Sequence, residues 1–324
     1  MSSQHLINLA SKRLGAQTIF STDDFFAEMS RMIDDAEPIF VAGKYDDNGK
    51  WMDGWESRRK RESGHDWCVV KLAARGYVEE IEIDTRHFTG NYAPAASLQV
   101  CSSDADNPAE EEWQALLGVQ QLRGDNQHVY SVSTPTPITH VRLHIYPDGG
   151  VARLRVRGTP DIHWSDLAKD EVVDLAASLN GGVALACNDE HFGVMNNLLA
   201  PGRGVNMGDG WETRRRREPG HDWVIVKLGH SGSLQSVEID TAHFKGNFPD
   251  RCSVQGIYMQ DAARESLPAQ SLYWTELLPE QKLAADTIHS FSLDKATPIV
   301  NYIRFNIHPD GGVSRLRLFG VIDG

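Results

Sequence analysis

A segment of 20 residues occurs twice in this chain of 324 residues. Residues 53–72 read DGWESRRKRESGHDWCVVKL and residues 209–228 read DGWETRRRREPGHDWVIVKL, so 15 of the 20 positions are identical. Two further motifs, D-T-x-H-F-x-G-N and P-D-G-G-V-x-R-L-R, recur in the same order after each segment. A period of roughly 160 residues is too long for a solenoid repeat and suits a whole domain. The repeat therefore predicts two homologous domains in tandem.

The two copies also set the expected domain limits. The first domain is predicted to span residues 5–158 and the second residues 171–320, with the polar connector TPDIHWSDLAKD at residues 159–170. The second copy lacks about ten residues around Pro38–Lys50 and gains about six within residues 264–283. We therefore expect the loops of the two domains to differ.

Composition argues against several classes of function. The 32 Lys and Arg residues against 45 Asp and Glu give a net charge of −13, which opposes the basic footprint of a nucleic-acid-binding protein. No apolar run is long enough to span a membrane, and the first residues lack the apolar core of a secretory signal peptide. The four cysteines are widely spaced and form no C-x-x-C pair. Cytoplasm, a reducing compartment, is the predicted location.

Short alternating segments within each copy predict β-strands. Residues 78–85 alternate apolar and acidic side chains, residues 140–145 alternate again, and residues 153–157 alternate arginine with apolar residues that are expected to face inward. Proline and glycine separate these runs. The pattern predicts a mainly β fold with two jelly-roll β-sandwiches in tandem. Residues 22–33 and 166–179 are the stretches expected to be helical.

The D-G-W-E-[ST]-R-R motif is dense in hydrogen-bonding groups. Glu56 can accept, Arg58 and Arg59 present planar donor forks that match carboxylates, and Trp55 supplies a stacking surface beside them. The alternative is structural: the tryptophan fills the core and the arginines pair with acidic neighbours. The counterparts in the second copy are Trp211, Glu212, Arg214 and Arg215.

The G-H-D-W motif places His65 beside Asp66 at the entry to a predicted strand. Imidazole titrates near neutral pH, so this pair is a candidate general base. Adjacent residues of a strand point to opposite faces, however, and the two side chains need not address one ligand. A histidine bonded to a backbone carbonyl is the structural alternative. The counterparts are His221 and Asp222.

The D-T-x-H-F-x-G-N motif ends a predicted strand and holds His87 and Asn91. The histidine is a candidate metal ligand or proton carrier, and the asparagine can hold an amide or ureido group. Gly90 is expected to adopt a positive φ and to place Asn91 at a loop tip, although the asparagine could simply complete the turn. The counterparts are His243, Gly246 and Asn247.

No general-purpose catalytic motif, such as H-E-x-x-H, a Walker loop or G-x-S-x-G, is present. The D-G-W-E-[ST]-R-R-[KR]-R-x-x-G-H-D-W segment and the D-T-x-H-F-x-G-N motif that follows it nevertheless resemble the allantoicase family, as do Lys50–Arg61 and Ser21–Ala27. The resemblance covers almost the whole chain. It implies two jelly rolls related to galactose-binding-like modules, hydrolysis of allantoate to ureidoglycolate and urea in purine degradation, and a homo-oligomer.

That substrate is a small anion with one carboxylate and two ureido groups on one carbon, which gives the candidate residues roles. Our hypothesis is that a histidine and a glutamate form the acid–base pair, that an arginine fork binds the carboxylate, and that the asparagines bind ureido groups. The candidate catalytic residues are Glu56, His65, Asp66, Glu212, His221 and Asp222. The candidate substrate-binding residues are Trp55, Arg58, Arg59, His87, Asn91, Trp211, Arg214, Arg215, His243 and Asn247.

Two alternatives stay open at this point. A divalent metal such as manganese could polarise the ureido oxygen, with His87, Asp66 or Glu56 as ligands, but their spacing is a weak signal. The second alternative is a tandem jelly-roll module that binds a small sugar-like or anionic ligand without turnover, because a fold does not fix a function. Both copies keep their polar residues, so one or two sites per chain are equally compatible with the sequence.

Overall fold

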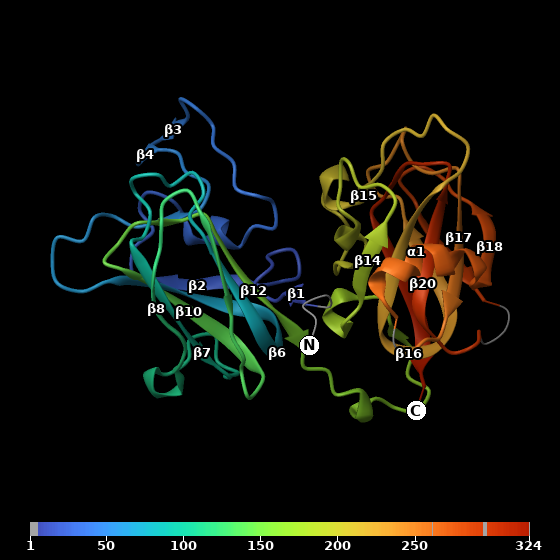
Figure 1. Ribbon diagram of the computed structural model, residues 1–324, viewed down its shortest axis with the longest axis horizontal. Coiled ribbons are helices and arrows are strands. Elements are labelled where there is room, and N and C mark those ends of the chain that lie inside the picture. Colours follow the sequence, from blue (N-terminus) through green and yellow to red (C-terminus); the bar gives the residue numbers. More distant parts are fainter. Residues whose placement is uncertain (1–5, 261, 294–296, 324) are drawn as a thin grey trace. The chain divides into compact units, whose positions relative to one another are not determined.

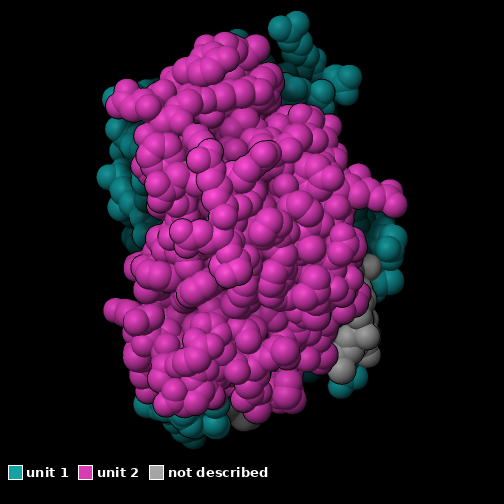
Figure 2. Space-filling view, turned by 90° about the vertical axis from the view of Figure 1, so that its left-hand side faces the viewer, with its two compact units in different colours: residues 1–5, 162–324 teal, residues 6–161 magenta. Residues whose placement is uncertain are grey.

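The computed structural model describes residues 6–260, 262–293 and 297–323 (Figure 1). The chain divides into two compact units, and each holds one copy of the repeat. Leu6–Asp161 form the unit with the first repeat, drawn in magenta in Figure 2, and the second repeat lies in the unit drawn in teal. His5, the predicted start of the first domain, lies outside the described residues. Within the described parts, no helix has the length and apolar character needed to cross a membrane.

The first repeat is built on one eight-stranded sheet in the order β1-β12-β6-β10-β7-β8, with β2 and β9 also paired to β6. Two short ladders, β3 with β4 and β5 with β11, lie outside this sheet. The strands are β1 (Ile7–Asn8), β2 (Gln17–Ser21), β3 (Tyr45–Asp46), β4 (Gly49–Lys50), β5 (Trp55–Glu56), β6 (Asp66–Asp84), β7 (Ala95–Cys101), β8 (Gln114–Gln121), β9 (Gln127–Ser131), β10 (Ile138–Tyr146), β11 (Gly150–Val151) and β12 (Arg153–Pro160).

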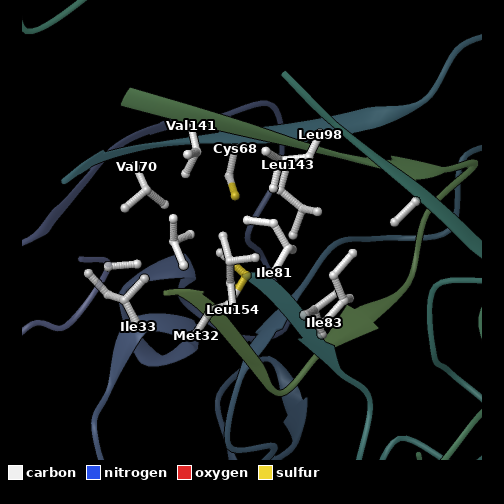
Figure 3. Close-up of a cluster of buried hydrophobic side chains, with 14 of the residues drawn as sticks. Met32, Ile33, Cys68, Val70, Ile81, Ile83, Leu98, Val141, Leu143 and Leu154 are labelled. Atoms are coloured by element: carbon white, nitrogen blue, oxygen red, sulfur yellow. The ribbon is translucent and has the colours of Figure 1, made fainter. Parts of the chain in front are cut away.

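The 19-residue strand β6 belongs to both layers of the sandwich. Its first half pairs with β2 and β10, and its second half pairs with β9 and β12. Alternate residues of both halves, such as Val70 and Ile81, point into one cluster with Leu143 and Leu154 (Figure 3). All four are buried, as expected where two apolar sheet faces pack together. One long strand therefore joins the two layers around a single core.

The second repeat has the same topology, with β16 in the place of β6 and the order β13-β22-β16-β20-β17-β18. The mainly β fold of two tandem, duplicated jelly-roll domains is therefore confirmed. The strands are β13 (Val173–Asp174), β14 (Val183–Cys187), β15 (Trp211–Glu212), β16 (Asp222–Asp240), β17 (Arg251–Ile257), β18 (Thr275–Lys282), β19 (Ile288–Ser292), β20 (Val300–His308), β21 (Gly312–Val313) and β22 (Arg315–Ile322).

The prediction of helices over residues 22–33 and 166–179 is wrong for most of both stretches, where only short 3-10 turns form: Met29–Ile33 within the first, and the ends of Trp164–Asp166 and Ser178–Asn180 in the second. In the first stretch, the backbone N–H groups of Phe26 and Ala27 bond to the carbonyl oxygen of Glu56, which removes them from any helical pattern. The second stretch contains strand β13, which pairs with β22. The described helices are short: η2 (Met29–Ile33), η3 (Glu110–Glu112), η4 (Trp164–Asp166), η5 (Ser178–Asn180), η6 (Met195–Leu199), η7 (Met207–Asp209), η8 (Arg264–Ser266), α1 (Leu267–Gln270) and η9 (Ser271–Tyr273).

The arginines of the R-L-R motif fix the irregular segment that leads into β5. Arg153 is only 1% exposed, and it donates to the carbonyl oxygen of Ala36 at 2.8 Å and to the Asp53 carboxylate at 2.8 Å. In the second repeat, Arg315 donates to the carboxylate of Asp209 at 2.7 Å. Both arginines thus donate hydrogen bonds to oxygen atoms of loop residues, which have no partner strand to supply a donor.

The P-D-G-G turn packs directly against the D-T-x-H-F motif. A Cβ atom on Gly150 would lie 2.1 Å from the ring of Phe88, and a Cβ atom on Gly312 would lie 1.9 Å from the ring of Phe244. Only glycine fits at these positions, because a real Cβ would overlap the fully buried rings. The turn and the phenylalanine loop therefore pack together beside β5 in the first repeat and β15 in the second, and Glu56, Asn91, Glu212 and Asn247 lie there.

Candidate functional site

The tryptophan of the D-G-W-E motif belongs to the core in both repeats. Trp55 is fully buried, and its Nε1–H donates to the carbonyl oxygen of Asp23 at 2.9 Å. Trp211 is equally buried and donates to the carbonyl oxygen of Asp189 at 2.9 Å. The sequence predicts that these rings stack on a ligand, but both rings are enclosed by protein. They offer no open stacking face.

The two arginines of each motif differ in what they contact. Arg58 is held by Asp23, which accepts from its backbone N–H at 2.9 Å and from its Nε at 2.6 Å. Arg59 is exposed and makes no hydrogen bond or ion pair with any other described residue. A guanidinium without a protein partner is available to bind a carboxylate bidentately. The same division holds in the second repeat between Arg214, bound to Asp189, and the exposed Arg215.

The glutamate and the asparagine, far apart in the sequence, meet in both repeats. The Nδ2 of Asn91 donates to Oε1 of Glu56 at 2.8 Å, and the Nδ2 of Asn247 donates to Oε1 of Glu212 at 2.5 Å. Glu56 is only 9% exposed, and this burial raises the pKa of its carboxyl, while Asn91 and the nearby charge of Lys50 act in the opposite direction. We call these two arrangements the Glu–Asn pairs.

The aspartates of the G-H-D-W motif are enclosed and paired. Asp66 is 1% exposed and accepts from Nζ of Lys60 at 2.6 Å and from Oγ1 of Thr22 at 2.8 Å. Asp222 is 2% exposed and accepts from Arg216 at 2.8 Å. The sequence predicts both aspartates as catalytic groups. Their position instead lets them anchor the basic segment that joins each Glu–Asn pair to the following histidine.

The histidines of the D-T-x-H-F motif hold loops in place. His87 has a φ of 70°, and its Nε2 lies 3.0 Å from the carbonyl oxygen of Pro38, so that nitrogen must be the donor. His243 has the same φ of 70°, and its Nε2 lies 2.7 Å from the carbonyl oxygen of Gly204. The predicted positive φ at Gly90 and Gly246 is wrong, because the left-handed residue of this loop is the histidine. In both rings, Nε2 is therefore committed to holding the loop.

The histidine of the G-H-D-W motif lies on the outer face of the sheet rather than beside the glutamate. The Nε2 of His65 is 2.9 Å from Nδ1 of His144, and its ring centroid is 4.5 Å from that of Tyr146. Burial lowers the pKa of His65, and burial together with Arg142 lowers the pKa of His144 to about 4. His65 and Glu56 therefore contact different sets of side chains.

In the second repeat, His221 occupies the position of His65 but has a different partner. Its Nε2 lies 3.2 Å from Oδ1 of Asn306, and its ring centroid lies 4.6 Å from that of His308. Burial lowers the pKa of both His221 and His308. Both repeats thus carry a cluster of polar rings and amides on the outer face of the sheet, formed by His65, His144 and Tyr146 in the first and by His221, Asn306 and His308 in the second.

The sequence reasoning missed the strand residues that surround these histidines. The missed residues of the first repeat are Gln99, Arg142, His144 and Tyr146, and those of the second are Gln255, Arg304, Asn306 and His308. A signal was present in the alternating segment His140–Tyr146, where polar residues occupy every second position. The alternation predicts that these polar positions face solvent, yet His140, Arg142 and His144 are all at most 9% exposed. A row of polar residues in a buried layer requires internal hydrogen-bond partners.

The residues proposed from the sequence as metal ligands do not converge. His87 contacts Pro38, Asp66 contacts Lys60, and Glu56 contacts Asn91. Across the described ranges, no group of three or more His, Cys, Asp or Glu side chains is arranged to hold a metal ion. These three residues therefore do not fit a manganese site in this arrangement.

Comparison with known proteins gives a consistent result. A family model described as "Allantoicase repeat" matches residues 7–161 and again residues 173–323. A probable allantoicase of Photobacterium profundum is 54% identical over 320 residues, which cover 98% of this chain and 97% of that protein. The crystal structure of allantoicase from Saccharomyces cerevisiae is similar with a TM-score of 0.83 at 33% identity, and the match covers 97% of this chain and 93% of that one.

Proposed function

The chain belongs to the allantoicase family, and from this membership we infer that it is a hydrolase that converts allantoate to ureidoglycolate and urea. The observation that carries this conclusion is the match of both repeats over nearly the whole chain. The reaction breaks the bond between the central carbon and one ureido nitrogen. That nitrogen takes a proton and leaves in urea, and the hydroxyl of a water molecule takes its place on the carbon.

We propose that Arg59 binds the substrate carboxylate. Its guanidinium is exposed and uncommitted among the described residues, whereas Arg58 is already bound to Asp23. Planar guanidinium and carboxylate groups form two parallel hydrogen bonds, which orients the substrate as well as holding it. Arg215 is the equivalent residue in the second repeat.

We propose that Glu56 is the acid that protonates the leaving nitrogen. Its pKa is raised by burial, so a larger fraction of its carboxyl groups carries a proton near neutral pH than in an exposed glutamate. The hydrogen bond from Asn91 fixes one oxygen of the carboxyl and leaves the other for the substrate. Glu212 and Asn247 repeat this arrangement.

His65 is the proposed base that activates water, and His221 is its counterpart. Burial lowers the pKa of both histidines, so their neutral, proton-accepting forms predominate at neutral pH. Only Nε2 of His65 is engaged, by His144, which leaves Nδ1 without a hydrogen bond among the described residues. The basic segment 57–64 joins Glu56 to His65 along the chain and carries Arg59 between them.

We further propose a cytoplasmic homo-oligomer that uses neither nucleic acid nor a membrane as a partner. The net charge of −13 opposes binding to phosphate backbones, and all four cysteines are free thiols. Exposed apolar side chains such as Val205 (76% exposed) and Tyr273 (88% exposed) are surfaces that association of identical chains would cover. Light scattering of the purified protein measures the number of subunits.

The decisive experiment is a urea-release assay with purified protein and allantoate, with and without a chelator. We expect urea and ureidoglycolate in equal amounts, and a rate unchanged by the chelator, because the three candidate ligands do not converge. A rate abolished by the chelator and restored by manganese would show that other residues hold a metal. Absence of urea under every condition, added divalent ions included, would contradict the hydrolase and favour a binding module.

A further inference from the structure

The side chain of Arg142 fixes the orientation of a glutamine amide on the outer face of the first repeat. Arg142 is 6% exposed, and its Nε and Nη2 lie 2.8 Å and 2.6 Å from one atom of the Gln99 amide. A guanidinium has donors and no acceptor, so that atom must be the carbonyl oxygen. Glu110 accepts from the same guanidinium at 2.6 Å and 2.8 Å, and Trp113 lies 4.6 Å from it, so the arginine is itself held.

The glutamine oxygen in turn fixes the proton of His144. The Nε2 of His144 is 2.7 Å from this oxygen and must be the donor. Burial and the positive charge of Arg142 keep His144 neutral at neutral pH, so its other nitrogen, Nδ1, is an acceptor. The Nε2 of His65, 2.9 Å from that acceptor, must then carry a proton.

The second repeat reaches the same result with one residue fewer. Arg304 is 3% exposed, and its Nε donates to Oδ1 of Asn306 at 2.8 Å. The same oxygen lies 3.2 Å from Nε2 of His221, which must therefore carry the proton. The guanidinium of Arg304 lies 4.5 Å from the ring of Trp223, and Ser271 accepts from its Nη1 at 2.6 Å.

We propose that these buried arginines set the tautomer of the catalytic histidines through a chain of hydrogen bonds, with the proton on Nε2 and the lone pair on Nδ1. The chain Arg142–Gln99–His144–His65 is the long relay, and Arg304–Asn306–His221 is the short relay. The inference rests on the proposed function only in assigning catalysis to the histidines. Arg142, Gln99, His144, Arg304 and Asn306 are then positioning residues, which act through the histidine without contacting the substrate.

The proton's position can be observed directly by NMR of full-length protein labelled with ¹⁵N in histidine. A hydrogen bond between two ring nitrogens couples His65 to His144, and the larger one-bond coupling identifies the nitrogen that carries the proton. Signals are assigned by comparison with His65→Gln. We expect the proton on Nε2 of His65 and a bare Nδ1. A proton on Nδ1 of His144 would overturn the relay.

The two repeats supply a matched pair of variants at residue 144. His144→Met removes the acceptor, so we expect the coupling to vanish and kcat to fall about fivefold, the loss expected for one orienting hydrogen bond. His144→Asn installs the short relay of the second repeat, and we expect it to restore a protonated Nε2 on His65 and most of the lost kcat. Gln99→Met, which leaves residue 144 intact, is the second variant if His144→Met does not fold.

The same measurements separate failure of the relay from failure of the proposed function. His65→Gln and His221→Gln test the base, whose loss is expected to lower kcat by about 10²- to 10⁴-fold in the repeat that carries the reaction. If neither substitution lowers kcat, the base assignment fails, while the proton position still decides the relay. If His65→Gln lowers kcat but His144→Met changes neither the signals of His65 nor kcat, the relay is wrong and the base assignment stands.

Discussion

The Glu–Asn pairs of the two repeats share a scaffold and differ in what surrounds them. In both, a buried tryptophan is bonded to the backbone of an aspartate that also binds the first arginine of the motif. In both, a left-handed histidine is bonded to a carbonyl of the preceding loop. The loop itself differs. The first repeat places the β3–β4 hairpin and Lys50 near its glutamate, whereas in the second Met207 lies 3.9 Å from Asn247.

This difference shows how a duplicated domain can keep its framework and change its chemistry. The shared contacts involve backbone atoms and the fully buried tryptophans, which tolerate little change. The hairpin is an insertion at the surface, where extra residues cost little stability. We therefore expect the frameworks to respond alike to mutation and the two glutamates to respond differently.

The largest expected effect tests the shared framework. Arg153→Met leaves the largely enclosed Asp53 carboxylate, 11% exposed, without its cation, and Arg315→Met does the same to Asp209. Each should lower the free energy of unfolding by about 3–5 kcal/mol, as loss of one partner of a buried ion pair does. Urea denaturation of the full chain measures this. The control, Arg75→Met, alters a pair whose arginine is 53% exposed, so the expected change is below about 1 kcal/mol. An equally small effect for Arg153→Met would show that the loop is held by other contacts.

The next test separates the two glutamates. Glu56→Gln keeps the hydrogen bond from Asn91 but removes the acidic proton, so kcat should fall about 100-fold or more. Glu212→Gln is the matched control, and we expect it to lower kcat by less than about twofold, because the burial that raises the pKa of Glu56 is less complete at the half-buried Glu212. Initial rates of urea release give both values.

Two other results would revise this comparison. If each substitution halves the rate, both repeats are active and independent. If only Glu212→Gln is severe, the second repeat carries the reaction, and the hairpin of the first has another role. The comparison of substrate affinity for the two variants then shows whether the silent site still binds allantoate.

The duplicated architecture could be predicted from the sequence, whereas the grouping of the site residues could not. The motifs recur at a domain-sized period, and alternation reveals the strands. The meeting of Glu56 with Asn91 depends on the turn at Gly150 packing on Phe88, a contact between distant segments. A tryptophan or a histidine can serve equally well in a core or in a ligand site, and the sequence does not distinguish the two. The enclosed position of Trp55 and the engaged Nε2 of His87 are therefore visible only in the structure.

A smaller effect concerns stability in acid and distinguishes His144 from its counterpart Asn306. The pKa of His144 falls from an ordinary 6.5 to about 4 through burial and the charges of Arg142 and His65, which outweigh the opposite influence of Glu110. Between these values the unfolded chain binds a proton at this residue and the folded chain does not, so acidification favours unfolding.

Between pH 7 and pH 5, His144 should account for a loss of about 2 kcal/mol in the free energy of unfolding. His144→Asn, which makes the first repeat resemble the second, should remove that part of the loss. Urea denaturation at the two pH values measures it, and the histidines that do not contact His144 contribute equally to both proteins; His65→Gln with and without His144→Asn separates the contribution of His65, which does contact it. An identical pH dependence in the wild type and the variant would mean that His144 titrates normally in the folded chain.

The smallest expected effect sharpens the role of the hairpin. The positive charge of Lys50 lowers the pKa of Glu56, against the larger effect of burial. If the protonated glutamate is the acid, kcat declines as pH rises through this pKa, and Lys50→Met should move the decline to higher pH by less than about one unit, because the lysine is exposed. Lys44→Met is the control, since its ammonium lies 3.5 Å from the centroid of the Trp51 ring at the base of the same hairpin, whereas the lysine whose charge lowers the pKa of Glu56 is Lys50. A kcat that rises instead of declining as pH increases through this pKa would mean that Glu56 acts in its ionised form, which would make it the base and leave the proton of the departing nitrogen to another group.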